Sequence, residues 1–507
     1  MSPRTIPTRP PDRKDLGDFP TPPGLVAEIL DALDVSGARF PRALEPTCGR
    51  GHFIAGLLGR PDPPREVLGL DIQPDHAEVA RSLGSPGVRL VVEAADIFRL
   101  DLARDLAWAG PGPLLVVGNL PWVTASALGA SGAANGPGRS NARGLRGIDA
   151  MTGASNFDIS EAIWLKLVRE LAPDRPTIAL LCKSAVARAV LGAVWPADLP
   201  VTRAEIRRID APRWFRASVD ACLLRVEVGP GPKARRAEVY RDLAATDPES
   251  TLGLEGGRLI ADVDAHRRAR FADGACPLTW RQGVKHDAAG VMELAHGPDG
   301  LLRNKLGEAV DVEEDHLYPL LKGTDLAGSG RPRPRLSVVV TQRRLGEDTR
   351  DLERRSPRLW AYLRAHADAF DRRKSSIYRG RPPFAMFGVG DYSFAPHKVA
   401  ISGMHKAPRF RALGPVEGRP TLVDDTCYFL PCRTAGQAAT LAGALNGPAA
   451  LDLVRALAFP DAKRPITQAV LRRVDLKALL AHDARPGPWR DEWESDWTAP
   501  TAVLTAP

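Results

Sequence analysis

The alternation of apolar runs and helical stretches predicts an α/β fold for residues 19–238, with a mostly parallel sheet and helices on both faces. A buried parallel sheet needs nearly continuous apolar strands, and crossover helices join them. Six short runs of this kind lie at residues 42–46, 66–72, 88–97, 112–122, 177–183 and 220–228. The rhythm is lost after the Gly- and Pro-containing segment 229–238, so a second, α+β domain is expected over residues 239–485.

The elements can be justified in chain order. Residues 1–18 are rich in Pro and charge and are expected to be flexible. Thr21 is a candidate N-cap and Pro22 suits the first helical position, so a helix is predicted through Leu33. A second helix is predicted over 160–171, with Asp158 or Ser160 as its N-cap.

Two segments lack such periodicity. Residues 125–156 are rich in Gly, Ala, Ser and Asn and interrupt the first domain just after a strand end. A long loop in that position is either functional or disordered. Residues 486–507 form a polar tail that contains Trp and Pro.

Composition places the chain among ordinary soluble proteins. Its 507 residues suffice for about two to four domains, and 44% hydrophobic with 26% charged residues excludes wholesale disorder. We expect no membrane helix, because no run of about 18 apolar residues occurs, and no secretory signal, because residues 1–18 lack an apolar h-region. The six cysteines form no CxxC pair, so neither a metal site nor a disulfide framework is expected, and a cytoplasmic location fits best. The net charge of +8 suits a polyanionic partner, but an Arg-rich chain carries such a charge without one.

A glycine turn follows the first apolar run. It reads Glu45-Pro46-x-x-Gly49-x-Gly51, and glycines at a strand-to-helix turn let a ligand approach the backbone. The spacing differs from the dinucleotide pattern GxGxxG, and the Gly-Lys-Ser/Thr of a phosphate-binding loop is absent. An ordinary tight turn can also hold two glycines, so this pattern does not decide the function alone.

Acidic residues end the next two runs. Asp71 stands about 20 residues past the glycines, where a carboxylate commonly accepts hydrogen bonds from ribose hydroxyls. Asp96 ends the third run and can accept from an adenine amino group, while Ile97 and Phe98 can hold the ring. A helix N-cap is the alternative interpretation of Asp71.

The fourth run ends in Gly118-Asn119-Leu120-Pro121-Trp122, the most specific pattern in the chain. An exocyclic amine on a base is a poor nucleophile, since its lone pair is delocalised into the ring. An Asn side-chain oxygen and a nearby backbone carbonyl can accept its two N–H bonds and direct the lone pair at a methyl donor. An aromatic ring can stack on the extruded base. A strand-ending turn with a core Trp is the structural alternative.

The joint order of these patterns carries a resemblance. With Phe19-Pro20-Thr21-Pro22 in front of them, they resemble the gamma class of S-adenosylmethionine-dependent DNA adenine-N6 methyltransferases of restriction–modification systems. The resemblance covers residues 19–228 and extends loosely to about 480. It implies a Rossmann-like methyltransferase domain, a C-terminal target-recognition domain and S-adenosylmethionine as cofactor. It implies a cofactor site lined by Phe19, Thr21, Glu45, Gly49, Gly51, Asp71, Ile72, Asp96, Ile97, Phe98 and Asn119. It implies a catalytic motif made of Asn119, Leu120, Pro121 and Trp122.

The catalytic motif departs from the usual Asn-Pro-Pro-aromatic form at Leu120. The acceptor there is a backbone carbonyl, which Leu can also supply. Ribosomal RNA adenine dimethyltransferases use Asn-Leu-Pro-aromatic too, so the choice between DNA and RNA stays open. Cytosine-N4 enzymes more often carry Ser at the first position, so Asn119 favours adenine.

The leading hypothesis is therefore a site-specific DNA adenine-N6 methyltransferase that flips its target base. An RNA adenine or DNA cytosine-N4 methyltransferase, a non-catalytic DNA-recognition subunit and a nucleotide-binding oxidoreductase are the alternatives. The resemblance implies double-stranded DNA as partner, together with a cognate restriction endonuclease or other defence-system proteins. No membrane partner is expected, and the oligomeric state stays open.

Candidate substrate contacts complete the prediction. Phe215, just before the last strand of the first domain, occupies a place where related enzymes put a second base-stacking aromatic, in addition to Trp122 of the motif. Arg281 and Lys285 belong to a basic cluster, and further basic residues interleave with aromatics between 343 and 394. Such a pattern suits phosphate contact and base-edge reading. A solvated Arg-rich surface is the alternative.

Overall fold

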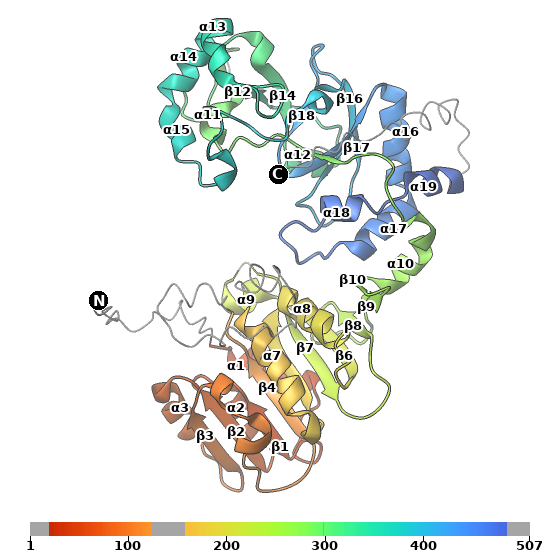
Figure 1. Ribbon diagram of the computed structural model, residues 1–507. Helices are drawn as coiled ribbons and strands as arrows, with labels where there is room; N and C mark the ends of the chain where they lie inside the picture. Colours follow the sequence, from red (N-terminus) through yellow and green to blue (C-terminus); the bar gives the residue numbers. More distant parts are fainter. Residues whose placement is uncertain (1–19, 123–157, 218, 298, 484–507) are drawn as a thin grey trace. The chain divides into compact units, whose positions relative to one another are not determined.

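The computed structural model describes residues 20–122, 158–217, 219–297 and 299–483 (Figure 1). Phe19, the N-terminal segment 1–18, the interrupting segment 125–156 and the tail 486–507 lie outside the described residues. The chain divides into two compact units between Val263 and Asp264, here called unit 1 and unit 2, and each is considered by itself. No helix of the described ranges is long and apolar enough to cross a membrane.

Unit 1 is built on one ten-stranded sheet with the order β10-β9-β8-β6-β7-β5-β4-β1-β2-β3. Its strands are β1 (Arg42–Glu45), β2 (Glu66–Asp71), β3 (Arg89–Ala94), β4 (Leu114–Asn119), β5 (Thr177–Lys183), β6 (Val201–Ile209), β7 (Ala221–Val228), β8 (Arg236–Tyr240), β9 (Ser250–Glu255) and β10 (Arg258–Ile260). Strands β3, β2, β1, β4 and β5 run parallel, whereas β7 is antiparallel to both of its neighbours, β5 and β6.

The sheet reverses its direction of growth between β1 and β4. The chain adds β2 and β3 on one side of β1 and then returns to place β4 on the other side. In open α/β sheets, a ligand binds outside the carboxyl ends of the strands at such a switch point. The ends of β1 and β4 therefore mark where a site is expected.

Helices cover both faces of the parallel strands (Figure 1). They are α1 (Pro23–Ala32), α2 (His52–Leu58), α3 (Pro74–Arg81), α4 (Leu102–Asp105), α7 (Ile159–Glu170), α8 (Ser184–Val194) and α9 (Ala211–Phe215), with short 3-10 turns η1 (Ile97–Arg99) and η3 (Ala172–Asp174). On one face, Leu25 and Ile29 of α1 join a buried cluster with Val117 and Leu181 of the sheet. Alternate residues of the same strands point to the other face, where α7 and α8 pack. The predicted α/β architecture is confirmed.

Helix starts agree only in part with the sequence analysis. Asp158 caps α7 by accepting a hydrogen bond from the backbone N–H of Ser160 at 3.1 Å, as one of the two alternatives predicted. Thr21 was wrong as the cap of α1, because the helix begins at Pro23 and Pro22 holds the N-cap position. The carbonyl of Pro22 accepts the first helical N–H groups, and the Thr21 side chain is buried instead.

The first unit extends further than the sequence suggested. The domain boundary expected at 238/239 falls inside β8, which pairs with β6, while β9 and β10 add to the same sheet. The compact unit ends at Val263. The Gly and Pro residues of segment 229–238 lie in a connection between two strands of one sheet. A linker between domains has the same local composition, so the sequence did not distinguish the two.

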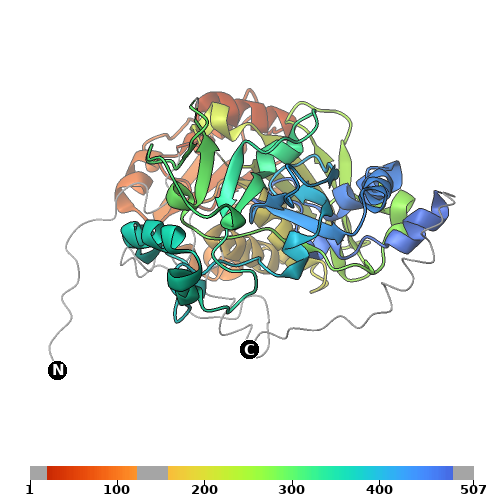
Figure 2. The same cartoon turned by 90° about the horizontal axis from the view of Figure 1, so that it is seen from above.

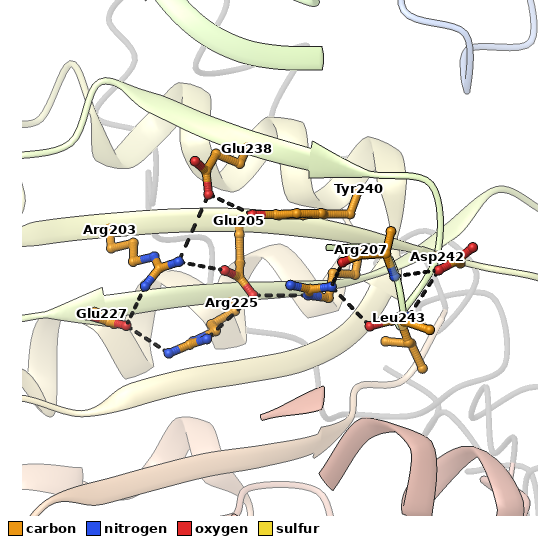
Figure 3. Close-up of polar contacts among 11 residues, drawn as sticks. Arg203, Glu205, Arg207, Arg225, Glu227, Glu238, Tyr240, Asp242 and Leu243 are labelled. Carbon is orange, nitrogen blue, oxygen red and sulfur yellow. Dashed lines mark hydrogen bonds and ion pairs between the residues drawn. The ribbon is translucent and has the colours of Figure 1, made fainter. Parts of the chain in front are cut away.

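Strand β6 is absent from the sequence analysis, because every second residue of its central part is charged. Arg203, Glu205 and Arg207 share one face, while the alternating Ala204 and Ile206 are buried. Figure 3 shows the resulting ion-pair network across β6, β7 and β8. Glu205 is buried, and its carboxylate lies 3.3 Å from Arg203, 3.2 Å from Arg207 and 3.5 Å from Arg225.

Unit 2 holds two smaller sheets, β11-β19-β16-β17 and β13-β12-β15-β14-β18. Their strands are β11 (Arg281–Gln282), β12 (Glu293–His296), β13 (Leu302–Arg303), β14 (Leu317–Leu321), β15 (Leu336–Val339), β16 (His397–Ser402), β17 (Arg411–Leu413), β18 (Leu422–Val423) and β19 (Cys427–Cys432). Their pairs are antiparallel apart from β14 with β18.

Within unit 2, two groups of helices flank the sheets (Figures 1 and 2). One group is teal, with α13–α15, and the other is blue, with α16–α19. The helices are α10 (Val263–Ala269), α11 (Ala289–Met292), α12 (Gly323–Ala327), α13 (Leu352–Arg355), α14 (Pro357–Ala365), α15 (Ala367–Asp371), α16 (Ala435–Leu445), α17 (Pro448–Leu457), α18 (Gln468–Leu471) and α19 (Leu476–His482). The 3-10 turns are η4 (Arg270–Ala272), η5 (Glu314–His316), η6 (Thr349–Asp351), η7 (Ser376–Tyr378) and η8 (Asp391–Phe394). Mixed helices and antiparallel strands confirm the α+β class.

Candidate active site at the carboxyl edge of the sheet

The turn between β1 and α2 requires both of its glycines. Gly49 has φ +51° and Gly51 has φ +81°, a left-handed region that residues with a Cβ rarely adopt. A Cβ on Gly51 would stand 2.7 Å from Leu83 and 3.0 Å from Ala80. A Cβ on Gly49 would meet no described atom within 4 Å, so the backbone there is open to a ligand.

Asp71, at the end of β2, holds this turn in place. One carboxylate oxygen accepts the backbone N–H of Gly49 at 2.8 Å, and the other accepts that of Gln73 at 2.8 Å. From the sequence, a direct ribose contact was predicted for Asp71, and this support of the turn was not foreseen. The ribose contact remains a prediction.

Glu45 ends β1 in a buried environment. Its carboxylate accepts the backbone N–H of Ile54 in α2 at 3.1 Å. Burial raises the pKa of Glu45 well above its ordinary value, and the nearby charge of Asp71 adds to that rise. Burial likewise raises the pKa of the Cys48 thiol. Glu45 therefore fixes the first turn of α2 against β1, so the turn carries its glycines on a rigid base.

The ends of β2 and β3 place further predicted residues along the same edge. The Asp96 carboxylate accepts the backbone N–H of Phe98 at 3.0 Å. Ile97 is buried and Phe98 is half-buried, whereas Ile72 is 40% exposed at the end of β2. An apolar side chain left in solvent beside the glycine turn offers a surface for an aromatic ring.

Asn119 ends β4 directly beside the glycine turn. The Thr47 hydroxyl donates to the backbone oxygen of Asn119 at 3.2 Å. A Cβ on Gly118 would lie 3.3 Å from the Glu45 side chain, so the two strand ends are in close contact. The structure thus brings together the two patterns that the sequence separates by about 70 residues.

The rest of the Asn-Leu-Pro-Trp motif is anchored from β5 and α7. The Leu120 N–H donates to the Leu181 carbonyl at 3.3 Å, which continues the β4–β5 ladder past Asn119. The Ser160 hydroxyl, fully buried in α7, donates to the Pro121 carbonyl at 2.7 Å. Lys183, at the end of β5, lies 2.7 Å from the Asp158 carboxylate that caps α7.

Trp122 and Phe215, the two aromatic residues predicted to contact the base, lie against each other. Their ring centroids are 5.0 Å apart with an interplanar angle of 65°, an edge-to-face contact. Trp122 is 7% exposed and belongs to the core cluster that also holds α1. The direct contact leaves no room for a base between the two rings, and base stacking on Trp122 remains a prediction.

The predicted substrate contacts of unit 2 differ from each other. Lys285 lies 2.8 Å from Asp287 and 3.5 Å from Asp425, so carboxylates compensate its charge. The guanidinium of Arg281 lies over the ring of Tyr392, 4.4 Å from its centroid. The carboxylates around Lys285 oppose a phosphate there, whereas the DNA contact of Arg281 remains a prediction.

Two supporting residues had no recognised role in the sequence analysis. Thr47 stands between the patterned residues of the glycine turn, and nothing in its spacing indicates a contact with Asn119. Ser160 was considered only as an N-cap, yet its hydroxyl serves the Pro121 carbonyl. Both are contacts between segments far apart in sequence, which spacing alone does not reveal.

The edge fits a cofactor with an aromatic base and a ribose. The backbone is open above Gly49, Ile72 is exposed beside it, and the carboxylates of Asp71 and Asp96 follow on neighbouring strands. The mostly parallel sheet, with β7 antiparallel between β5 and β6, and the residues at this edge agree with the Rossmann-like S-adenosylmethionine-dependent methyltransferase class that the sequence resembles.

Comparison with known proteins narrows that class. The chain is 34% identical over 468 residues to the type II methyltransferase M.NspV of Nostoc sp. (strain ATCC 29411 / PCC 7524), covering 92% of this chain and 97% of the relative. The chain therefore belongs to the type II methyltransferases of restriction–modification systems, and S-adenosylmethionine is its methyl donor. No family model matches the chain.

A solved structure agrees in fold. The restriction–modification enzyme MmeI, described as type IIL and solved in complex with DNA, superposes with a TM-score of 0.51 at 12% identity. The match covers 91% of this chain and 64% of MmeI. At this identity, the similarity establishes the fold alone.

Proposed function

We propose that this chain methylates the N6 amino group of adenine at a specific sequence in double-stranded DNA. The observation that supports this most is the contact between the glycine turn and the catalytic motif, through the Thr47 hydroxyl and the Asn119 carbonyl. The contact puts a turn suited to a cofactor next to a side chain suited to an amine. Membership of the type II methyltransferases supports DNA as the substrate.

The residues of the glycine-turn edge would hold the cofactor. Gly49 leaves the backbone open, Asp71 and Asp96 offer carboxylate acceptors, and Ile72 offers an apolar surface. When bound there, S-adenosylmethionine supplies an electrophilic methyl group on a sulfonium. Thr21, Glu45 and Gly51 act through packing and the shape of the turn. Phe19 stays a predicted cofactor contact.

The Asn119 motif would orient the target amine. Its side-chain oxygen and the Leu120 carbonyl accept the two N–H bonds of the amine, so the nitrogen lone pair points away from both. The adenine must leave the duplex to reach this edge, and the ring of Trp122 then stacks on it. Pro121 keeps the motif extended, with its carbonyl held by Ser160.

The proposal assigns distinct roles to the two units. Unit 1 carries methyl transfer, and unit 2 carries recognition of the DNA sequence. A cognate restriction endonuclease would cut the same sequence when it is unmethylated. Cleavage of unmodified DNA by the product of a neighbouring gene, blocked by prior methylation with this chain, would test that partnership.

Nucleoside mass spectrometry tests the reaction. Purified full-length protein is incubated with isotopically labelled S-adenosylmethionine and with genomic DNA or total RNA, and the digested nucleosides are identified. We expect labelled N6-methyl-2′-deoxyadenosine in the DNA digest and no labelled nucleoside in the RNA digest. Labelled N4-methylcytosine, or label only in RNA, would overturn the proposal. Cofactor binding without any transfer would identify a non-catalytic DNA-recognition subunit.

A further inference from the structure

Two arginines of unit 2 are stacked on aromatic rings of one short helix. The guanidinium carbon of Arg281 lies 4.4 Å from the ring centroid of Tyr392. That of Arg343 lies 4.1 Å from the ring centroid of Phe394. Both rings belong to η8, whose residues Asp391–Phe394 form a single 3-10 turn. We call Arg281, Arg343 and their two rings the η8 arginine pairs.

Neither arginine is neutralised. Within the described part of the chain, no carboxylate lies within 4.0 Å of either guanidinium, although many other arginines have such a partner. The neighbour Arg344 lies 3.0 Å from the Asp391 carboxylate, and Arg464 lies 3.4 Å from Asp425. The η8 arginine pairs therefore keep their positive charge available to an outside ligand.

Stacked arginines in unit 1 provide the contrast. Arg39, Arg42, Arg207 and Arg213 also lie over aromatic rings, and each of them additionally pairs with a carboxylate. Ring stacking in unit 1 thus accompanies ion pairs that hold the fold together. In the η8 arginine pairs, stacking positions a guanidinium without using its charge.

The stacking fixes the plane of each guanidinium. Arg343 also donates one N–H to the Tyr318 hydroxyl at 3.0 Å, and Tyr318 packs on Phe394 with centroids 5.1 Å apart. A guanidinium has five N–H donors, so the others remain for a ligand. A fixed planar fork matches the paired O6 and N7 acceptors of guanine in the major groove, and it can also bind a phosphate through two parallel hydrogen bonds, so the two must be separated by experiment.

We propose that Arg281 and Arg343 each read a guanine of the recognition sequence, with Tyr392 and Phe394 setting their planes. This inference rests on the proposed function of the chain. The two rings are two residues apart, so their Cα atoms lie within about 7 Å. The two arginines therefore address one stretch of the duplex, and the recognition sequence contains guanine.

Base-analogue substitution tests the inference. Sequencing of DNA methylated by the wild-type protein first gives the recognition sequence, and each guanine is then replaced by 7-deazaguanine, which lacks the N7 acceptor. For the wild type, we expect kcat/KM to fall by about tenfold to a hundredfold at the guanine that an arginine reads. For Arg281→Ala or Arg343→Ala, we expect kcat/KM on the unmodified duplex to be reduced by the same factor. Replacing the guanine that this arginine reads by 7-deazaguanine should then cause no further loss of kcat/KM.

Matched variants separate base reading from phosphate contact. Arg344→Ala removes the adjacent charge and is expected to leave kcat/KM and specificity unchanged. Arg343→Lys keeps the positive charge but not the planar guanidinium fork, so we expect kcat/KM to stay as low as in Arg343→Ala. Recovery of the wild-type rate in the Lys variant would identify a phosphate contact and overturn the inference. A recognition sequence without guanine, or no 7-deazaguanine effect on the wild type, would overturn it without any variant.

The two proposals fail in different ways. If the wild-type protein transfers no methyl group to DNA, the proposed function fails and the inference falls with it. If the wild type methylates adenine while Arg281→Ala, Arg343→Ala, Arg343→Lys and Arg344→Ala all keep its rate and its recognition sequence, only the inference fails. Each variant must have the melting temperature of the wild type, so that a lower rate is not caused by unfolding. Arg343→Lys is the mildest of these substitutions.

Discussion

Unit 1 and unit 2 fix their functional side chains in different ways. In unit 1, the Asp71 carboxylate accepts two backbone N–H groups and the Thr47 hydroxyl holds the backbone carbonyl of Asn119, all at the ends of parallel strands. In unit 2, Arg281 and Arg343 rest on rings of η8, which lies far from Arg281 in the sequence. Under the proposed function, the residues for methyl transfer are held by strand register, which changes little. The residues proposed for recognition are held by short connecting segments, which can change without altering the sheet.

The largest effect is expected from a substitution in the catalytic motif of unit 1. Asn119→Ala removes the side-chain acceptor for the amine, so we expect kcat to fall by about 100- to 1,000-fold, as for loss of one preorganised polar group in other enzymes. Affinity for S-adenosylmethionine should fall far less. Single-turnover transfer and calorimetric titration of the same samples measure both. Ser82→Ala, at the exposed end of α3, serves as the unaffected control. Equal losses in both measurements would show that Asn119 only shapes the cofactor site.

The glycine turn offers a contrast between two neighbours. Gly51→Ala adds a Cβ at φ +81° and 2.7 Å from Leu83, so we expect a loss of about 3 kcal/mol in the free energy of unfolding of unit 1. Gly49→Ala meets no atom, so it costs only about 1 kcal/mol of backbone strain. Its Cβ nevertheless occupies the open side of the turn, and cofactor affinity should fall more than stability. Urea unfolding measures the stability of the two variants, and cofactor titration measures their affinity. A larger loss of stability in Gly49→Ala than in Gly51→Ala would contradict the geometry.

Asp71→Asn tests the support of that turn. An amide has one acceptor oxygen, so its NH2 group would face a backbone N–H of Gly49 or Gln73. We expect a loss of about 2 kcal/mol in the free energy of unfolding, because a buried donor is left unsatisfied. Asp75→Asn in the exposed first turn of α3 is the matched control. A loss of cofactor affinity with unchanged stability would instead favour a ribose contact as the main role of Asp71.

Unit 2 carries a buried lysine in its own core. Lys398 in β16 is 1% exposed and donates to the Ala395 carbonyl at 2.7 Å, and burial lowers its pKa to about 7. Between pH 7 and the ordinary value of 10.5, the unfolded state binds one more proton, so stability rises with pH across that window. We expect Lys398→Met to raise the free energy of unfolding at pH 7 by about 1–2 kcal/mol. The gain should shrink toward pH 10.5, and a gain independent of pH would refute the assignment.

Ser160 gives the smallest expected effect. Ser160→Ala leaves the buried Pro121 carbonyl without its 2.7 Å donor, so the Asn119 motif loosens and stability falls by about 1 kcal/mol. As a positioning residue, Ser160 should lower kcat by about fivefold while KM for DNA stays constant. Ser160→Thr keeps the hydroxyl and should restore kcat. Failure of Thr to restore it, with stability intact, would remove Ser160 from the account.

The sequence predicted unit 1 better than unit 2 for a physical reason. Continuous apolar runs predict parallel strands, and parallel strands bring their carboxyl ends to one edge, so Glu45, Asp71, Asp96 and Asn119 could be placed together. Strand β6 was missed because charged residues (Arg203, Glu205 and Arg207) alternate with apolar ones in its central part, so it shows no continuous apolar run. The tertiary hydrogen bonds of Thr47 and Ser160 follow no periodic pattern. In unit 2, no rhythm indicates which segments meet, and the compensation of Lys285 by Asp425 could not be foreseen.

A structure of the full chain with its target duplex and sinefungin, a cofactor analogue without a transferable methyl group, tests the central claim most directly. The account predicts an extruded adenine at the end of β4, with its N6 within about 3 Å of the Asn119 side-chain oxygen and of the Leu120 carbonyl. It also predicts the analogue over Gly49. An adenine that stays paired, or one bound away from Asn119, would contradict it.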